Sequence, residues 1–181
     1  APRTFLHEMP TALDALRSVG ILDPSKDHVR FGHQSFLDFK IACLAKTELD
    51  SGADLAAWLI ENDEQSLHRR SQFKYLLSLL RDEAPECFAE VIKPLLLDES
   101  VRFHLRHIIL QALGNVEDPT QGEIDLVIEL LANSQWSELI VAHVICSHPS
   151  WVEKLLERKL LSDWLLAEEV LVQRAIRICG S

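Results

Sequence analysis

Apolar residues recur at helical spacing along most of the 181-residue chain. The clearest stripe runs from Val101 to Ala112 through Leu105, Ile108 and Ile109, and these offsets place all five side chains on one face of a helix. Similar stripes occur between short polar breaks. They predict helices over residues 11–19, 34–47, 52–61, 64–81, 85–96 and 99–114. Further stripes predict a helix that holds Ile124 to Leu131, another that holds Leu139 to Ile145, one from 151, and a last one from about 162 to 179.

Residues that begin or end helices stand at the breaks between these stripes. Gly20 fits a helix end because glycine adopts the left-handed conformation at low cost. Pro85 suits a first helical turn, where its missing amide hydrogen is harmless. Asp98 is expected to cap the helix that follows it. Capping boxes, in which two side chains bond to free backbone amides, are expected at residues 51–54, 120–123 and 150–153.

One short stretch favours β-structure. Residues 28–31 alternate polar and apolar, which predicts at most one small hairpin, near residues 21–32. Elsewhere, helices joined by short turns must run antiparallel to their neighbours. Helix starts near Asp98, Ser134 and Ser162 are separated by roughly 28 to 36 residues, a spacing typical of solenoid repeats. The predicted fold is therefore all-α, built from stacked antiparallel helix pairs.

The segment LLDESVR, residues 96–102, resembles the link between the two helices of a HEAT repeat. The resemblance implies that Asp98 caps the second helix and that Arg102 reaches a neighbouring unit. The next link, residues 133–137, lacks the Val-Arg pair, so one unit matches in sequence and the others by architecture. We accordingly expect a HEAT/armadillo-like right-handed array over residues 48–181.

The segment VRFGHQSFLDFKIA, residues 29–42, resembles the motif that ends the winged-helix region of STAND NTPases, the NACHT group included. This chain has Asp38 where the family prefers Glu. The resemblance implies that residues 1–47 form the end of a winged-helix-like region. It also implies that His33 senses nucleotide in a full-length parent, by touching the phosphate of bound ADP and holding the closed state.

No phosphate-binding loop of the form G-x-x-x-x-G-K-[ST] occurs in the chain. We therefore expect no cofactor in this segment, and ADP or ATP would belong to an upstream nucleotide-binding domain of the parent. The alternative for His33 is a packing or capping histidine that bonds to the local backbone.

Acidic residues dominate the composition. The formal net charge of −10 makes nucleic acid a poor partner, because an acidic surface repels phosphates. A basic strip of Lys and Arg residues, Arg81 among them, is a local exception. It is a candidate site for binding an acidic protein. The alternative is an ordinary solvated helix face. The candidate protein-binding residues are Arg69, Arg70, Lys74, Arg102 and Arg106.

Catalytic and metal sites are not expected. His104, His107, His143 and His148 are not accompanied by carboxylates or cysteines at the spacing of a zinc site, and no G-x-S-x-G elbow is present. Cys146 and His148 lie too close on one helix end to act as nucleophile and base. The four tryptophans are expected to anchor the core or the contacts between repeats: Trp58, Trp136, Trp151 and Trp164.

Cysteine spacing and hydropathy bear on the compartment. The four cysteines are widely spaced and predict buried, reduced thiols, hence a cytoplasmic protein: Cys43, Cys87, Cys146 and Cys179. No run approaches the roughly 20 apolar residues that span a membrane.

These observations predict a non-catalytic regulatory segment of a STAND-type NTPase. It would couple nucleotide state to the sensing of a ligand or protein partner, and it could form a homo-oligomer through the parent. The alternative is a free-standing HEAT-like scaffold that binds a partner protein. A small enzyme or metal protein is a third class, which bound zinc would favour.

Overall fold

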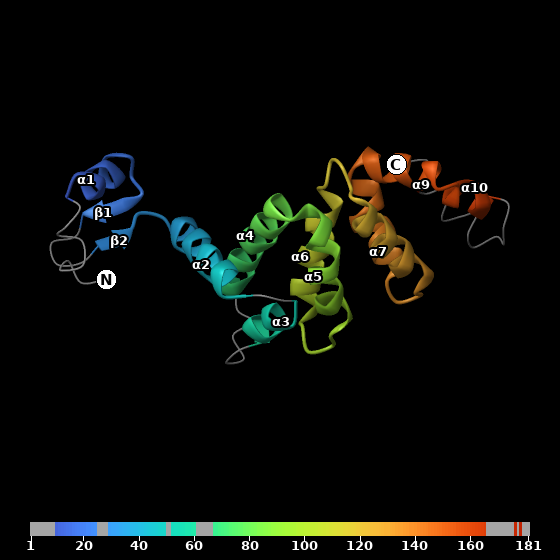
Figure 1. Ribbon diagram of the computed structural model, residues 1–181, viewed down its shortest axis with the longest axis horizontal. Coiled ribbons are helices and arrows are strands. Elements are labelled where there is room, and N and C mark those ends of the chain that lie inside the picture. Colours follow the sequence, from blue (N-terminus) through green and yellow to red (C-terminus); the bar gives the residue numbers. More distant parts are fainter. Residues whose placement is uncertain are drawn as a thin grey trace.

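The computed structural model describes residues 10–24, 29–49, 52–60, 67–165, 176 and 178, and its fold over these residues is all-α with one two-stranded hairpin, as predicted (Figure 1). The elements, in chain order, are α1 (Pro10–Ser18), β1 (Leu22–Pro24), β2 (Val29–Phe31), α2 (Gln34–Glu48), α3 (Gly52–Ile60), α4 (Leu67–Glu83), α5 (Pro85–Leu97), α6 (Phe103–Gly114), α7 (Gln121–Ala132), α8 (Ser137–His143), the 3₁₀ turn η3 (Ile145–Ser147), α9 (Pro149–Glu157) and α10 (Leu160–Leu165).

The helices stack in two layers. In one layer α2 packs on α4, α4 on α6, and α6 on α8. In the other layer α3 packs on α5, α5 on α7, and α7 on α9. The chain advances along the long axis of the molecule from the hairpin to α10 (Figure 1). Stacked helix pairs therefore build an elongated array, while the right-handed sense of that array stays a prediction.

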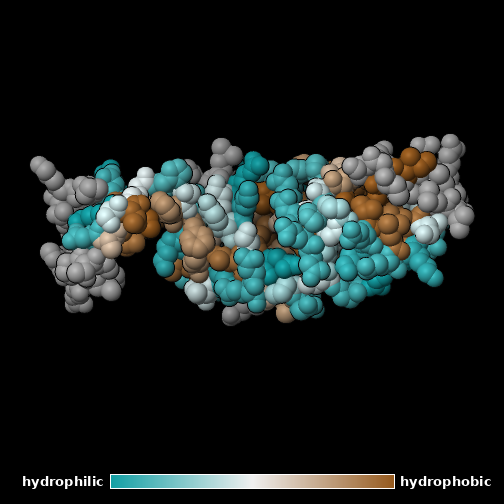
Figure 2. All heavy atoms as spheres, turned by 90° about the horizontal axis from the view of Figure 1, so that it is seen from above, coloured by the Kyte–Doolittle hydropathy of each residue, from teal (hydrophilic) through white to brown (hydrophobic). Residues whose placement is uncertain are grey.

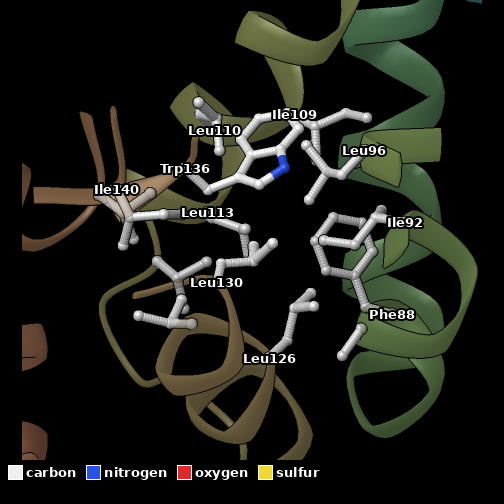
Figure 3. Close-up of a cluster of buried hydrophobic side chains, with 14 of the residues drawn as sticks. Phe88, Ile92, Leu96, Ile109, Leu110, Leu113, Leu126, Leu130, Trp136 and Ile140 are labelled. Carbon is white, nitrogen blue, oxygen red and sulfur yellow. The ribbon is translucent and has the colours of Figure 1, made fainter. Parts of the chain in front are cut away.

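The hydrophobic core fills the space between the two layers (Figure 3). Trp136 lies at the centre of one cluster, and the indole Nε1 of the fully buried Trp151 donates to the Leu113 carbonyl at 3.0 Å. Trp164 is also buried, whereas Trp58 is half-buried. The cluster around Trp136 comprises Phe88, Ile92 and Leu96 of α5, Ile109, Leu110 and Leu113 of α6, Leu126 and Leu130 of α7, and Ile140 of α8.

Several predicted helix boundaries are confirmed. Gly20 has a φ of +74°, the conformation that favours glycine after α1. Pro85 occupies the first turn of α5. The box before α7 is complete, since Thr120 accepts from the Glu123 amide and the Glu123 carboxylate accepts from the Thr120 amide. The local sequence was sufficient for all three because their partners lie within a few residues.

Two predicted caps are wrong. Asp98 accepts from the Ser100 amide at 2.8 Å and so stabilises the turn after α5, whereas α6 begins later, at Phe103, with Arg102 as its N-cap. The helix expected from residue 151 begins at Pro149, because His148 caps it. The expected cap at Ser51 and most of the last predicted helix lie outside the described residues.

The hairpin leads directly into α2. Strands β1 and β2 pair antiparallel, with Leu22 opposite Phe31. Buried Asp38 of α2 then accepts from Gln72 Nε2 of α4 at 3.3 Å, and Phe39 meets Tyr75 edge-on at 5.6 Å. Packing thus joins α2 to the array, and the division of the chain near residue 47 stays a prediction.

Cysteine burial differs from expectation. Cys43 and Cys146 are half-buried and Cys87 is exposed, and none of these three is in a disulfide. The prediction of a buried thiol is wrong for Cys87, and Cys179 lies outside the described residues.

Within the described ranges, every helix is too short or too polar to cross a membrane.

Candidate functional site

Acidic residues are missing from most of two neighbouring helices of the array. Residues 67–81 and 100–116 contain six Lys or Arg residues and no Asp or Glu, although the chain has 28 acidic residues in all. These segments form most of α4 and α6, which pack against each other in one layer. The fold therefore gathers positive charge in the middle of an acidic protein.

The predicted basic strip separates in three dimensions. The Arg69 guanidinium lies 4.2 Å from the centre of the Trp58 ring, and that of Arg106 lies 5.7 Å from the centre of the Trp136 ring. Cations above indole rings are attracted by the ring electrons, so these two arginines help to hold helices together. Arg102 lies at the exposed start of α6.

Arg81 also has a structural role. Its Nε donates to Glu123 Oε1 at 2.6 Å, and its Nη2 donates to the Asp118 carbonyl at 2.9 Å. Glu123 is fully buried. The ion pair therefore fixes α4 to the start of α7.

Arg70 and Lys74 remain together on the surface. Both are exposed and lie one turn apart on α4. On α6, Phe103 is 56% exposed and stacks on His107 at 6.1 Å. The His107 ring in turn meets the His143 ring of α8 edge-on at 4.4 Å. We call these five residues, Arg70, Lys74, Phe103, His107 and His143, the basic face.

His107 lies in an environment that disfavours its charged form. Burial lowers the pKa of His107 below its usual value, and the positive charges of His143 and Arg70 lower it further. Its Nδ1 has no hydrogen-bond partner among the described residues. Because protein atoms enclose this nitrogen, water does not solvate it, which adds to the cost of charging the ring.

A groove of about 820 Å³ adjoins the basic face between α4, α6 and α8. Lys74 and His143 line it next to polar side chains such as Ser78 and Gln111. Seen from above, much of the middle of the array is hydrophilic, while hydrophobic side chains gather toward both ends (Figure 2). The groove is also lined by four carboxylates, which come from the later part of α4, the start of α5 and the loop after α6: Asp82, Glu86, Glu117 and Asp118.

His33 caps α2. Its Nδ1 accepts from the Ser35 amide at 3.2 Å and lies 2.6 Å from Ser35 Oγ. His148 does the same at α9, where its Nδ1 accepts from the Ser150 amide at 3.3 Å. His33 is thus a capping residue, as one of the two interpretations predicted. Because Nδ1 accepts, the neutral ring of His33 carries its proton on Nε2.

An aromatic patch flanks His33. Phe31 and Phe36 are each 38% exposed and Phe39 is 44% exposed. With Ile21 and Tyr75 they line a shallow, mostly apolar hollow between the hairpin, α2 and α4. Adjoining exposed aromatic side chains of this kind are typical of a surface that another protein part covers.

The four histidines considered for metal do not converge. His107 and His143 meet, but no group of three or more His, Cys, Asp or Glu side chains suited to a metal ion occurs in the described part of the chain. His148 is engaged in its helix cap.

Comparison with protein-family models, curated proteins and solved structures finds no match to this chain. The HEAT and STAND resemblances therefore rest on residues 96–102 and 29–42.

Sequence reasoning missed Phe103, His107 and His143 as binding candidates. Phe103 and His107 follow the four-residue spacing of one helix face, which is a signal of contact. His143 stands 36 residues further on, about one repeat period, and only the stacking of α8 on α6 brings it to His107.

Proposed function

We propose that the chain is a non-catalytic regulatory segment of a larger STAND-type NTPase, in which the helical array binds a protein partner and the hairpin end meets an upstream nucleotide-binding domain. The observation that carries this proposal is the cluster of exposed aromatic residues beside His33. Phe31 and Phe36 belong to the STAND-like motif, yet they are largely left out of the array's core.

The position of His33 supports a second role besides capping. Its side chain is exposed, and its Nε2 has no hydrogen bond within the described residues. An exposed N–H at the start of a helix is suited to donate to an anion, because the neighbouring backbone amides favour the same charge. In the proposed parent, this donor contacts the phosphate of ADP and holds the closed state.

Three variants of the full-length parent test this role by the release rate of labelled ADP. His33→Asn keeps an N-cap, because Asn is a strong capping residue, but it removes Nε2. His33→Ala removes both functions. We expect both to release ADP about tenfold faster, the effect of losing one charge-assisted hydrogen bond.

His148→Ala is the matched control, since it removes the same kind of cap from α9. It is expected to leave ADP release unchanged. Wild-type release from His33→Asn would contradict the nucleotide role and leave His33 as a capping residue alone.

A free-standing scaffold is the second candidate. It is favoured by the position of the large groove, which lies within the array between α4, α6 and α8 and not at the hairpin. Such a protein needs no nucleotide to present its surface. A reading frame without an upstream phosphate loop would favour it over the STAND parent.

A further inference from the structure

We propose that the basic face binds an acidic, Asp- or Glu-rich segment of a partner protein, whose carboxylates contact Arg70, Lys74 and the His107–His143 pair. This inference deepens the proposed function by giving the chemistry of the partner. It rests on one part of that function, namely that the array binds a protein. It holds equally for a segment of a STAND NTPase and for a free scaffold.

The charge distribution is the first reason. Lys46, Lys93 and Arg158 each pair with a carboxylate on the surface of the array. Among the described residues, neither Arg70 nor Lys74 forms an ion pair, and their own segment of α4 contains no acidic residue. Two exposed cations that have no ion pair within the described part of the chain are complementary to carboxylates of a partner.

The histidine pair is the second reason. The two rings are 4.4 Å apart and belong to adjacent helices, and His107 Nδ1 lacks a partner within the described ranges. A carboxylate bound to Arg70 beside the pair would place a negative charge close to both rings. It would also favour the protonated imidazole, so that binding takes up a proton and strengthens as the pH falls.

The groups that face His107 allow this pH response. Arg70 of α4 and His143 of α8 act on it from the neighbouring helices. Asp82 lies eight residues from Lys74 along α4, which corresponds to about 12 Å. The groove carboxylates Glu117 and Asp118 follow the end of α6. Glu138 lies more than one turn before His143 on α8, and Glu86 lies at the start of α5.

Phe103 favours a protein ligand over a nucleic acid. Protein-binding hot spots combine exposed aromatic side chains with arginine, as Phe103 and Arg70 do. Binding of nucleic acid draws on many contacts from Lys and Arg to phosphates, about six to ten in a typical case, whereas this face has two permanent cations on a chain of net charge −10. A short acidic peptide segment therefore fits better than RNA or DNA.

The test uses the 181-residue chain and fluorescence anisotropy with a short labelled peptide of Asp and Glu, against a matched peptide of Asn and Gln. We expect the acidic peptide to bind and the amide peptide not to bind. Arg70→Ala and Lys74→Ala should each raise the Kd about tenfold, as for loss of a charge-assisted hydrogen bond. Arg158→Ala and Lys93→Ala remove equal charges from residues paired elsewhere on the array and should change the Kd less than about twofold.

Acidification provides an independent readout. Between about pH 7.5 and about pH 6 the Kd for the acidic peptide should fall several-fold, and His107→Gln should abolish that fall. Circular dichroism verifies that each variant is folded. If the histidine variant does not fold, the Arg70→Ala variant still tests the inference, because Arg70 is exposed and its loss does not disturb the core.

Three results would overturn the inference. These are equal binding of the amide peptide, equal effects of the face and control variants, and tighter binding of a single-stranded RNA oligomer than of the acidic peptide. None of them bears on the His33 experiment, which follows ADP release from the full-length parent. The two proposals therefore fail separately.

Discussion

At the residue scale, the close approach of two backbone segments explains the glycine at position 114 better than its place at a helix end does. Gly114 is the last residue of α6, a position where glycine is common. A Cβ at this position would lie 2.2 Å from the His143 carbonyl oxygen and 3.1 Å from Ser147. The end of α6 therefore touches the backbone at the end of α8, and no side chain fits between them.

Gly114→Ala should accordingly lower the free energy of unfolding by about 2 kcal/mol, the cost of forcing packed backbone apart. Urea unfolding of the 181-residue chain measures it. Gly122→Ala is the control, because its Cβ would meet Ala89 at an ordinary 3.5 Å and alanine favours the helix, so that we expect a gain of about 0.5 kcal/mol. Equal effects of both substitutions would contradict the close approach.

The environment of His107 predicts a stability that depends on pH. Its pKa is lowered by burial first, then by His143 and Arg70, so that the unfolded chain binds more protons than the folded one just below the usual histidine pKa of about 6.5. Stability should be fully present above that pH and fall as the pH drops toward the lowered folded pKa. The urea midpoint of the wild type should be lower at about pH 5.5 than at about pH 7.5. In His107→Gln the difference between these two midpoints should be smaller. Identical losses in both proteins would show that His107 does not carry the effect.

At the element scale, the boundaries that were predicted correctly depend on neighbours in sequence. Thr120 and Glu123, or Gly20 after α1, need only the few residues around them. The errors arose where two local solutions compete. Asp98 bonds to the turn and not to the helix, and His148 caps α9 two residues before the expected Ser150.

Contacts between elements could not be predicted from the sequence. Glu123 was expected as part of a capping box, and its buried carboxylate also pairs with Arg81, 42 residues earlier. The same holds for Asp38 and Gln72, which join α2 to α4. These pairs depend on how each helix is rotated within its layer. Helical periodicity predicts which face of a helix is buried, but it does not predict which residue of another helix that face meets.

Glu123→Gln should test the Arg81 pair because glutamine can still complete the capping box. We expect a loss of about 2 kcal/mol, since a buried ion pair that loses one partner leaves the other charge uncompensated, and Arg81 is itself partly exposed. Glu129→Gln removes a comparable pair with Lys93 that is open to solvent, and should cost less than about 0.5 kcal/mol. Similar losses in both variants, measured by chemical unfolding, would mean that burial of Glu123 adds nothing.

At the scale of the whole molecule, the array separates two surfaces. The aromatic patch beside His33 lies at the hairpin end, and the basic face lies in the middle, on α4, α6 and α8 (Figure 1). In the proposed parent, the aromatic patch would meet the upstream domain and the basic face would meet the partner. A segment that couples an upstream domain to a ligand needs this separation, because both contacts must be made at once.

The reading frame that encodes this chain tests the regulatory proposal most directly. Sequencing it upstream of Ala1 should reveal a phosphate loop of the form G-x-x-x-x-G-K-[ST], placed after a strand and before a helix in a nucleotide-binding domain. A complete reading frame that lacks this loop would contradict the STAND parent and leave a helical scaffold whose function resides in the basic face.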